Sequence, residues 1–181
     1  MKVGVVSDSH GNLEYLRRAC RMLIERGAEI LVHLGDELEP DSKILAEFPA
    51  RSICVPGVFE KAYRDPSIPN RILTELGGLR VLITHTPESH ENDLPGDPKP
   101  EEIRREGKAD LILYGHTHLY DARMEEGVLL INPGHLKVSD KKGRPPSFAL
   151  LDIEGRRVRV EILGMNGEVL LERAFELAGR G

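Results

Sequence analysis

Two histidines stand one residue apart in the stretch ILYGHTHLYDA, where His116 and His118 follow an apolar run. A similar pair lies near the N-terminus, where Asp8 and His10 follow the run KVGVV. In an extended chain, residues i and i+2 point to the same side, so each pair can direct two side chains to one place. Carboxylates and neutral imidazoles together suit Mn²⁺, Fe²⁺, Zn²⁺ or Ni²⁺, whereas Ca²⁺ prefers oxygen ligands. The spacing therefore indicates a transition-metal site.

Further Asp and His residues follow other apolar runs in the same way. Asp36 comes after EILVHL, His85 after RVLIT, and His135 after VLLIN with only Pro-Gly between them. The carboxyl ends of neighbouring strands in an open α/β sheet form the usual binding crevice. We therefore expect these side chains to converge at one edge, although a single histidine at a strand end is more often structural.

The elements that must position these residues follow from the apolar pattern. Short apolar runs bounded by Gly, Asp or Pro predict buried strands. Apolar residues at helical spacing before Gly27 predict a first helix, and two more are expected at about 40–47 and from Pro100 onward. The predicted strands are 2–6, 29–34, 51–55, 80–84, 110–114 and 128–132.

The C-terminal third has a different pattern. The runs SFALLDI, RVRVEIL and EVLLERAFEL predict a β-meander with tight turns. Strands that alternate with helices and are followed by hairpins predict an α/β fold, with two sheets packed as a sandwich and helices outside. We expect residues 1–181 to form one domain of this kind. The polar stretch 87–100 is expected to be a mobile surface loop.

Composition excludes several classes of function. The net charge is −5 and Lys and Arg form no block, which argues against broad nucleic-acid binding. No apolar run is long enough to span a membrane, and the first residues lack the pattern of a signal peptide, so we expect a cytoplasmic protein. Cys20 and Cys54 are then expected to be free thiols. The 30% of charged residues and the absence of Gln and Trp favour a heat-adapted source.

An ordered set of motifs resembles the calcineurin-like metallophosphoesterases, and among them the small prokaryotic phosphodiesterase branch. The motifs are SDSHGN (7–12), HLGD (33–36), THTP (84–87), GHTH (115–118) and NPG (132–134). The resemblance implies a four-layer α/β/β/α sandwich and two divalent transition-metal ions. We expect manganese, with zinc, iron and nickel as alternatives.

The resemblance also implies a role for each matching residue. Asp8, His10 and His118 would hold the first metal, His85 and His116 would hold the second, and Asp36 would bridge the two. Asn12 and His135 are candidates for substrate binding. The implied function is hydrolysis of a small phosphodiester by a hydroxide that bridges the two metals and attacks phosphorus in line with the leaving oxygen.

The sequence departs from the family pattern after the third predicted strand. Val58 stands where the family has an Asn that ligates the second metal, and Phe59 where some members have a His that protonates the leaving group. We therefore expect a weakened second metal site, for which Glu60 is a poorly placed substitute ligand. No general acid is evident. His90 would offer one only if the 87–100 loop closed over the metals, and is otherwise expected in solvent.

An alternative function is that of a protein-interaction scaffold with little or no activity. The retromer scaffold subunit is similar to this chain in its C-terminal hairpins and in an aromatic residue at the position of Phe59. Because all six Asp and His positions remain, we favour the enzyme. A large exposed apolar patch away from them would favour the scaffold. A homodimer is a further expectation, because the edge strands of the C-terminal hairpins could pair between two chains.

Overall fold

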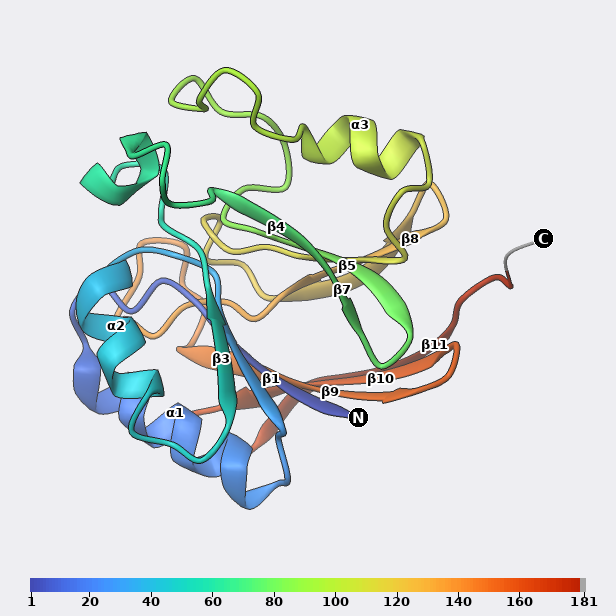
Figure 1. Ribbon diagram of the computed structural model, residues 1–181. Helices are drawn as coiled ribbons and strands as arrows, with labels where there is room; N and C mark the ends of the chain where they lie inside the picture. The colour runs from blue at the N-terminus through green and yellow to red at the C-terminus, as the bar shows by residue number, and fades with distance from the viewer. Residues whose placement is uncertain (180–181) are drawn as a thin grey trace.

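The computed structural model describes residues 1–179, which form two β-sheets packed face to face (Figure 1). In sheet A the spatial order is β11 (Val169–Glu176), β10 (Arg157–Gly164), β9 (Ser147–Glu154), β1 (Lys2–Val6), β2 (Ile30–His33) and β3 (Arg51–Cys54). In sheet B it is β4 (Arg71–Leu76), β5 (Leu79–Thr84), β6 (Leu111–Leu113), β8 (Val128–Asn132) and β7 (Asp121–Glu125).

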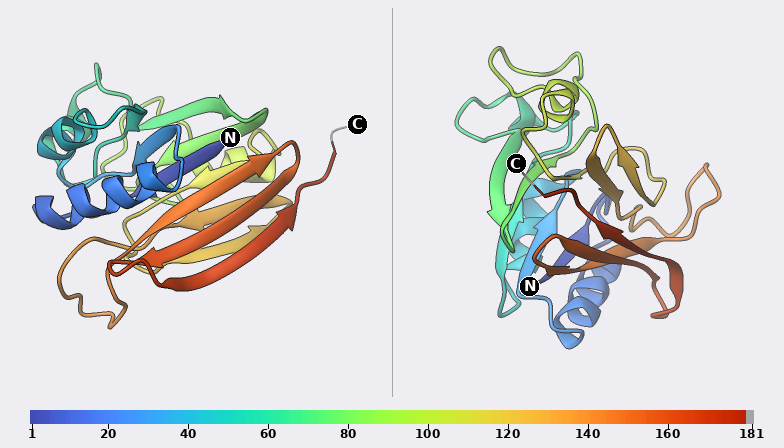
Figure 2. Two further views of the ribbon diagram at one scale, coloured as in Figure 1. Left: turned by 90° about the horizontal axis from the view of Figure 1, so that it is seen from below. Right: turned by 90° about the vertical axis from the view of Figure 1, so that its right-hand side faces the viewer.

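Helices cover the outer faces of both sheets. On sheet A these are α1 (Leu13–Glu25) and α2 (Leu38–Leu45), and on sheet B α3 (Pro100–Arg105). A short 3₁₀ helix, η1 (Lys61–Arg64), follows β3. Residues of α1 pack with Phe148 of β9 and Leu163 of β10, and the left view of Figure 2 shows that most of the outer face of β9–β11 extends beyond this helix. The arrangement confirms the predicted fold class, a two-sheet sandwich flanked by helices.

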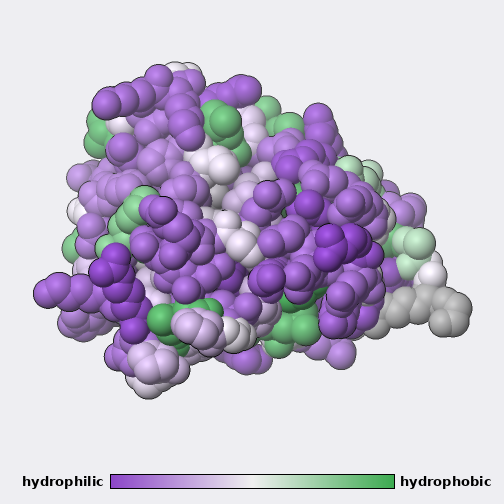
Figure 3. Space-filling model, turned by 90° about the horizontal axis from the view of Figure 1, so that it is seen from above, coloured by the Kyte–Doolittle hydropathy of each residue, from purple (hydrophilic) through white to green (hydrophobic). Residues whose placement is uncertain are grey.

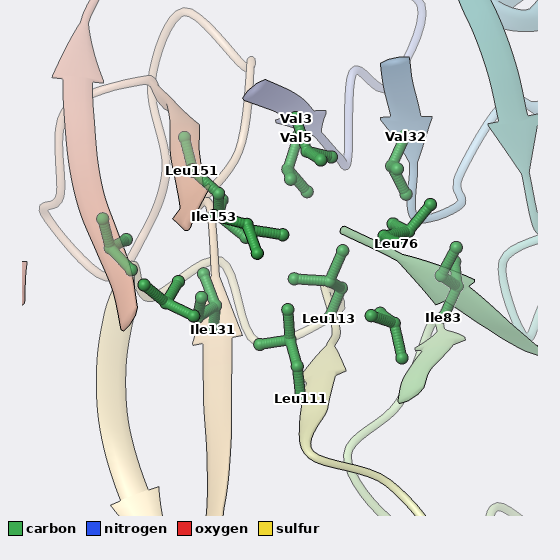
Figure 4. Packing of buried hydrophobic residues seen from close by; sticks show 14 of the residues in the cluster. Val3, Val5, Val32, Leu76, Ile83, Leu111, Leu113, Ile131, Leu151 and Ile153 are labelled. Atoms are coloured by element: carbon green, nitrogen blue, oxygen red, sulfur yellow. The ribbon is translucent and has the colours of Figure 1, made fainter. Parts of the chain in front are cut away.

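The main apolar core lies between the two sheets (Figure 4). Alternation along β1 explains how one strand serves two layers, because successive side chains of a strand point to opposite faces. Val3 and Val5 pack between the sheets against Leu113 and other side chains of sheet B, whereas Val6 packs on the opposite side with Leu16 of α1.

Parallel strands at the centre of each sheet determine where the polar residues meet. The strands β1, β2 and β3 pair in parallel in sheet A, as do β5, β6 and β8 in sheet B. The carboxyl ends of each set therefore lie at one edge of their sheet, as expected from the sequence. The backbone continues these ladders, since the amide of Asp8 donates to the carbonyl of Gly35 and that of Gly115 to the carbonyl of His85.

Two observed strands, β4 and β7, lie outside the predicted ones. β4 joins β5 through Gly77-Gly78, and β7 joins β8 through Glu126-Gly127, and all four turn residues have positive φ. Gly-Gly between apolar residues is a hairpin signal, so β4 could have been predicted from the sequence. The strand β7, with the sequence DARME, has little apolar alternation.

The 87–100 loop is held by specific contacts, although the sequence favoured a mobile segment. Asp93 forms an ion pair with the buried Arg71 at 2.9 Å and accepts a hydrogen bond from the Tyr63 hydroxyl. Asn92 donates to the carbonyl of Val58 at 2.9 Å. Asp97 accepts from the amide group of Asn70. The loop is thereby attached to the start of β4 and to the segment that precedes it.

Both cysteines are free, as predicted. Burial raises the pKa of Cys20 to about 12, so its thiol stays protonated at neutral pH. Within residues 1–179, no helix has the length and apolar character needed to cross a membrane.

Candidate metal centre

Four of the predicted ligands form one compact group. Asp8, His10, Asp36 and His118 each offer a ligand atom, and these atoms all lie within 4.8 Å of one another. His118 Nε2 is 3.1 Å from His10 Nε2 and 3.2 Å from Asp8 Oδ1. Because the first three residues follow strands of sheet A and His118 follows β6 of sheet B, the group joins the two sheets.

The other two predicted ligands lie next to this group. His85 Nε2 is 3.2 Å from His116 Nδ1 and 3.6 Å from Asp36 Oδ1. The second carboxylate oxygen of Asp36, Oδ2, faces His10 Nε2 at 3.3 Å. Asp36 thus presents one oxygen to each set of side chains, which is the geometry of a bridging ligand. All six predicted side chains come together.

Hydrogen bonds orient two of the imidazoles. His85 Nδ1 donates to the carbonyl of Leu34 at 2.6 Å, and His118 Nδ1 donates to Asp140 Oδ1 at 2.8 Å. Each bond directs the Nε2 lone pair towards the centre, as is usual for metal-ligating histidines. Asp140 could not be predicted from the sequence pattern, because it lies in an irregular loop 22 residues after His118.

The backbone of the ligands is strained. Residues with positive φ are uncommon unless they are glycine, and they cluster at functional sites. Five of the six candidate ligands adopt this conformation: Asp8 (54°), His10 (47°), Asp36 (61°), His116 (63°) and His118 (60°). These turns redirect the chain as soon as each strand ends, so that alternate side chains reach the same point.

Two glycines allow the close approach of these turns. A Cβ atom on Gly57 would overlap the Asp36 carboxylate, and one on Gly115 would overlap the Ser7 hydroxyl and the Asp8 carboxylate. Ser7 Oγ and the backbone amide of His116 both donate to Asp8 Oδ2. The ends of β1 and β6 are thus locked together around the Asp8 side chain.

The two carboxylates differ in their affinity for a proton. Burial and the neighbouring charge of Asp8 raise the pKa of Asp36 to about 8. Burial alone would also raise the pKa of Asp8, but the adjacent imidazoles of His118 and His85 hold it well below its usual range. Like charges this close disfavour a second ionisation, which a bound cation would make favourable.

Most of the imidazoles are held neutral. Burial is the main cause that lowers the pKa of His116 to about 4, and it lowers the pKa values of His10 and His85 as well. The pKa of His118 is raised, because Asp8 and Asp140 flank its ring. Neutral imidazole is the form that binds a metal.

These donors fit divalent transition metals. Asp8 Oδ1 is buried and has no hydrogen-bond partner in the described part of the chain. His118 Nε2 faces this oxygen at 3.2 Å, and because Nδ1 carries the proton given to Asp140, the contact is favourable only with a proton or a cation at Nε2. In the metal-free chain a proton takes this place, in keeping with the raised pKa of His118, and a bound cation would replace it. Two carboxylates with four imidazoles are the ligand set of Mn²⁺, Fe²⁺, Zn²⁺ or Ni²⁺.

The altered motif after β3 supplies no further ligand. Val58 is fully buried and offers hydrocarbon only. The Glu60 carboxylate accepts hydrogen bonds from the backbone amides of Gly57 and Leu38, the first residue of α2. These bonds do not favour Glu60 as a substitute ligand, although its charge contributes to the raised pKa of Asp36.

The two candidate substrate-binding residues have other contacts. Asn12 Oδ1 caps α1 by accepting from the amide of Tyr15, and its amide group donates to the carbonyl of Leu136. His135 is fully buried, with Nδ1 accepting from the amide of Lys137 and Nε2 facing the carbonyl of Arg144. The polar atoms of Asn12 and His135 are thus already hydrogen-bonded within the protein. Their contact with substrate remains a prediction, and these hydrogen bonds argue against it.

Two further histidines can be assigned from their contacts. His33 is buried, pairs with Asp41 at 2.7 Å and accepts from the amide of Gly35, so its role is structural. The expectation that His90 lies in solvent is wrong. Its ring is half-buried, with its centroid 6.1 Å from that of His116 and 5.5 Å from that of Phe59.

An open groove lies on the other side of the centre, next to His10. It has a volume of about 330 Å³ and is lined by residues 9–12 and 137–139. Lys137 is the cationic side chain among them, and it lies 3.4 Å from Asp140. The centre is therefore open to ligands from the side of His10.

Comparison with known proteins agrees with this geometry. A model described as "Calcineurin-like phosphoesterase superfamily domain" matches residues 1–156. A phosphodiesterase of Methanocaldococcus jannaschii is 27% identical over 175 residues, which cover 90% of this chain and 99% of that protein. The crystal structure of a predicted phosphoesterase from Streptococcus pneumoniae superposes with a TM-score of 0.74 at 27% identity, over 96% of both chains. Vacuolar protein sorting 29 from Cryptosporidium parvum shares the fold, with a TM-score of 0.71 at 19% identity over 97% of both chains.

Proposed function

The chain belongs to the calcineurin-like phosphoesterase superfamily, and we propose that it is a metal-dependent phosphodiesterase for small substrates. The observation that carries the proposal is the convergence of the six candidate ligands from the strand ends of both sheets, with Asp36 between the two sets. The names of related phosphodiesterases support hydrolysis of phosphate esters.

The candidate ligands would hold two divalent cations. Asp8, His10 and His118 would bind one, His85 and His116 the other, and Asp36 both. Such a pair supplies hydroxide near neutral pH and offsets charge on the phosphoryl oxygens. Manganese is our first candidate, because the set mixes carboxylate and imidazole donors. The second site has fewer side-chain ligands, and we expect it to bind more weakly.

The side chains of this protein would orient the substrate and keep their own geometry fixed. Hydrogen bonds to Leu34 and Asp140 hold two imidazoles in place, so that little reorganisation is needed during reaction. The ring of His90 lies 6.1 Å from that of His116, centroid to centroid, and its Nδ1 accepts from the amide of Asn92. In that tautomer Nε2 carries the ring hydrogen, which could be donated in a hydrogen bond to a substrate oxygen.

Hydrolysis of bis-p-nitrophenyl phosphate by metal-loaded protein tests the proposal. This substrate has a good leaving group and needs little protonation. We expect turnover with Mn²⁺, and a loss of at least about 100-fold in kcat for Asp36→Asn, because one charged ligand to both cations is lost. Absence of hydrolysis with Mn²⁺, Ni²⁺, Zn²⁺ and Mg²⁺, despite full loading measured by elemental analysis, would refute it.

A scaffold function is the second candidate. It is favoured by the shared fold of vacuolar protein sorting 29 and by the loss of a ligand at Val58. On the face shown in Figure 3, however, apolar side chains lie in small separate groups on a largely hydrophilic surface. A fully loaded protein without hydrolytic activity would make this candidate the better one.

A further inference from the structure

We propose that Phe59 is a platform for a planar ring of the substrate, so that the preferred phosphodiester carries an aromatic group such as a nucleobase beside its phosphate. This inference rests on the proposed phosphodiesterase function and specifies its substrate class. The observations that carry it are the exposure of Phe59, its neighbours and the rigidity of its turn.

Phe59 is the most exposed large apolar side chain within residues 1–179, at 72%. A single exposed phenylalanine is common and needs no function. The position of this one is what matters. Its ring centroid lies 6.2 Å from that of His116, a candidate ligand, and 5.5 Å from that of His90, which it meets edge-on at 87°. The ring therefore stands at the rim of the metal centre with much of its surface free.

The turn that presents Phe59 is fixed on both sides. The amide of Glu60 donates to the carbonyl of Gly57, and the Glu60 carboxylate accepts from the amides of Gly57 and Leu38. Val58, inside the turn, is fully buried, and its carbonyl accepts from Asn92 of the 87–100 loop. An aromatic side chain on so rigid a turn loses little freedom when a ligand binds, which favours affinity.

The opposite rim has a matching feature. Val138 is the second most exposed large apolar side chain of the described residues, at 71%, and it lines the groove beside His10 together with Lys137. The two most exposed apolar side chains thus flank the centre. A phosphate held between them has room for one organic arm on the ring of Phe59 and another in the groove, as a diester requires.

Aromatic faces bind nucleobases by stacking without reading their sequence. The neighbouring imidazole of His90 extends the aromatic surface around Phe59. Since the position of the phosphate is set by the cations, the free face of Phe59 would select esters whose next group is flat. An alkyl group in that place would gain less, because it has no π-face to stack.

The test compares two ligands, one with and one without a nucleobase. Adenosine 5′-monophosphate and ribose 5-phosphate share the sugar phosphate, and their dissociation constants are measured by calorimetry on the Mn²⁺-loaded protein. We expect the nucleotide to bind about tenfold tighter in the native protein, the gain of one stacked base. Phe59→Leu keeps an apolar side chain without a ring. This variant should bind the two ligands with equal affinity, with the dissociation constant of ribose 5-phosphate unchanged. Phe59→Trp should keep the preference of about tenfold for the nucleotide.

Leu73→Ala is the matched control, since this side chain is half-exposed on β4 and is expected to leave both constants unchanged. Equal affinity of the native protein for the two ligands would overturn the proposal. So would a decrease in affinity in Phe59→Leu that is the same for both ligands. If bis-p-nitrophenyl phosphate is hydrolysed but the two ligands bind equally, only the ring platform is lost. Binding of neither ligand would count against the phosphodiesterase as well.

Discussion

At the scale of single residues, His118 is held on both sides of its ring. Its Nε2 faces Asp8, and its Nδ1 donates to Asp140, a carboxylate that also accepts from the amide of Lys142. These hydrogen bonds hold the pKa of Asp140 well below its usual range, so it stays ionised. Removal of such a partner from a metal-ligating histidine costs about 10–100-fold in metal affinity.

We therefore predict that Asp140→Ala weakens Mn²⁺ binding by about 10–100-fold, with Asp140→Asn intermediate because its amide oxygen can still accept. The measurement is calorimetric titration of apo-protein. Asp152→Asn, a carboxylate on β9 far along the sheet from the ligands, is the control and should bind as the native protein does. Unchanged affinity in Asp140→Ala would show that the hydrogen bond has no positioning role.

The raised pKa of Asp36 leads to a prediction about pH. Below about pH 8 the apo-protein holds a proton on this carboxyl that a cation must displace. The apparent affinity for Mn²⁺ should therefore rise by up to about tenfold per pH unit between pH 6 and 8 and level off above. Calorimetry in buffers of different ionisation enthalpy should detect the released proton. A constant affinity over this range would contradict the assignment.

At the scale of elements, the ion pair of Asp93 with Arg71 is one of the contacts that hold the 87–100 loop, and with it His90, near the centre. The Arg71 side chain is fully buried, and that of Asp93 is 15% exposed. Removal of one partner of a buried ion pair leaves the other charge uncompensated and destabilises the fold by about 3–5 kcal/mol. The loop is thus a coupled part of the fold, and not an appendage.

We predict that Asp93→Asn lowers the free energy of unfolding by about 3 kcal/mol and increases amide hydrogen exchange in residues 87–94. Urea unfolding and exchange followed by mass spectrometry measure the two effects. Glu91→Gln changes an exposed carboxylate of the same loop and should alter neither. If the two variants behave alike, the ion pair does not hold the loop.

The strands that the sequence predicted have a local signal, and of the two that were missed, β4 also had one in Gly77-Gly78, whereas β7 depends on pairing. The strands β1, β2, β5 and β8 are continuous apolar runs that need burial on both faces, so their positions could be read directly. The strand β7 is polar along most of its length, and it is a strand because β8 offers it a free edge. That edge exists only in the folded sheet.

At the scale of the whole molecule, the candidate ligands come from both sheets, so bound cations would link the layers. Ions that bind the folded chain alone stabilise it by about 2.7 kcal/mol at 100 times the dissociation constant. For a chain of this size, that corresponds to an increase of about 5–10 °C in Tm. We predict such an increase when Mn²⁺ is added to apo-protein, and its reversal by a chelator, in differential scanning calorimetry.

Asp36→Asn should reduce this increase, whereas Asp152→Asn should preserve it. Equal Tm values with and without Mn²⁺ would mean that the candidate ligands of the two sheets do not bind the same metal ions. The site was largely predictable for the same reason that the strands were. Its residues follow strand ends in a fixed order, whereas Asp140 and His90 lie on irregular loops whose course depends on tertiary contacts.

The left-handed backbone at the ligands bears on how the histidines are retained. Each such residue costs about 1–3 kcal/mol relative to a relaxed conformation, and glycine would avoid most of that cost. Three of these positions carry histidine, namely His10, His116 and His118. Their combined cost is a large share of the roughly 5–15 kcal/mol that stabilises a typical domain. Glycine at these three positions would relieve the strain but remove the imidazoles, so the fold gives up stability to hold three nitrogen donors at one point.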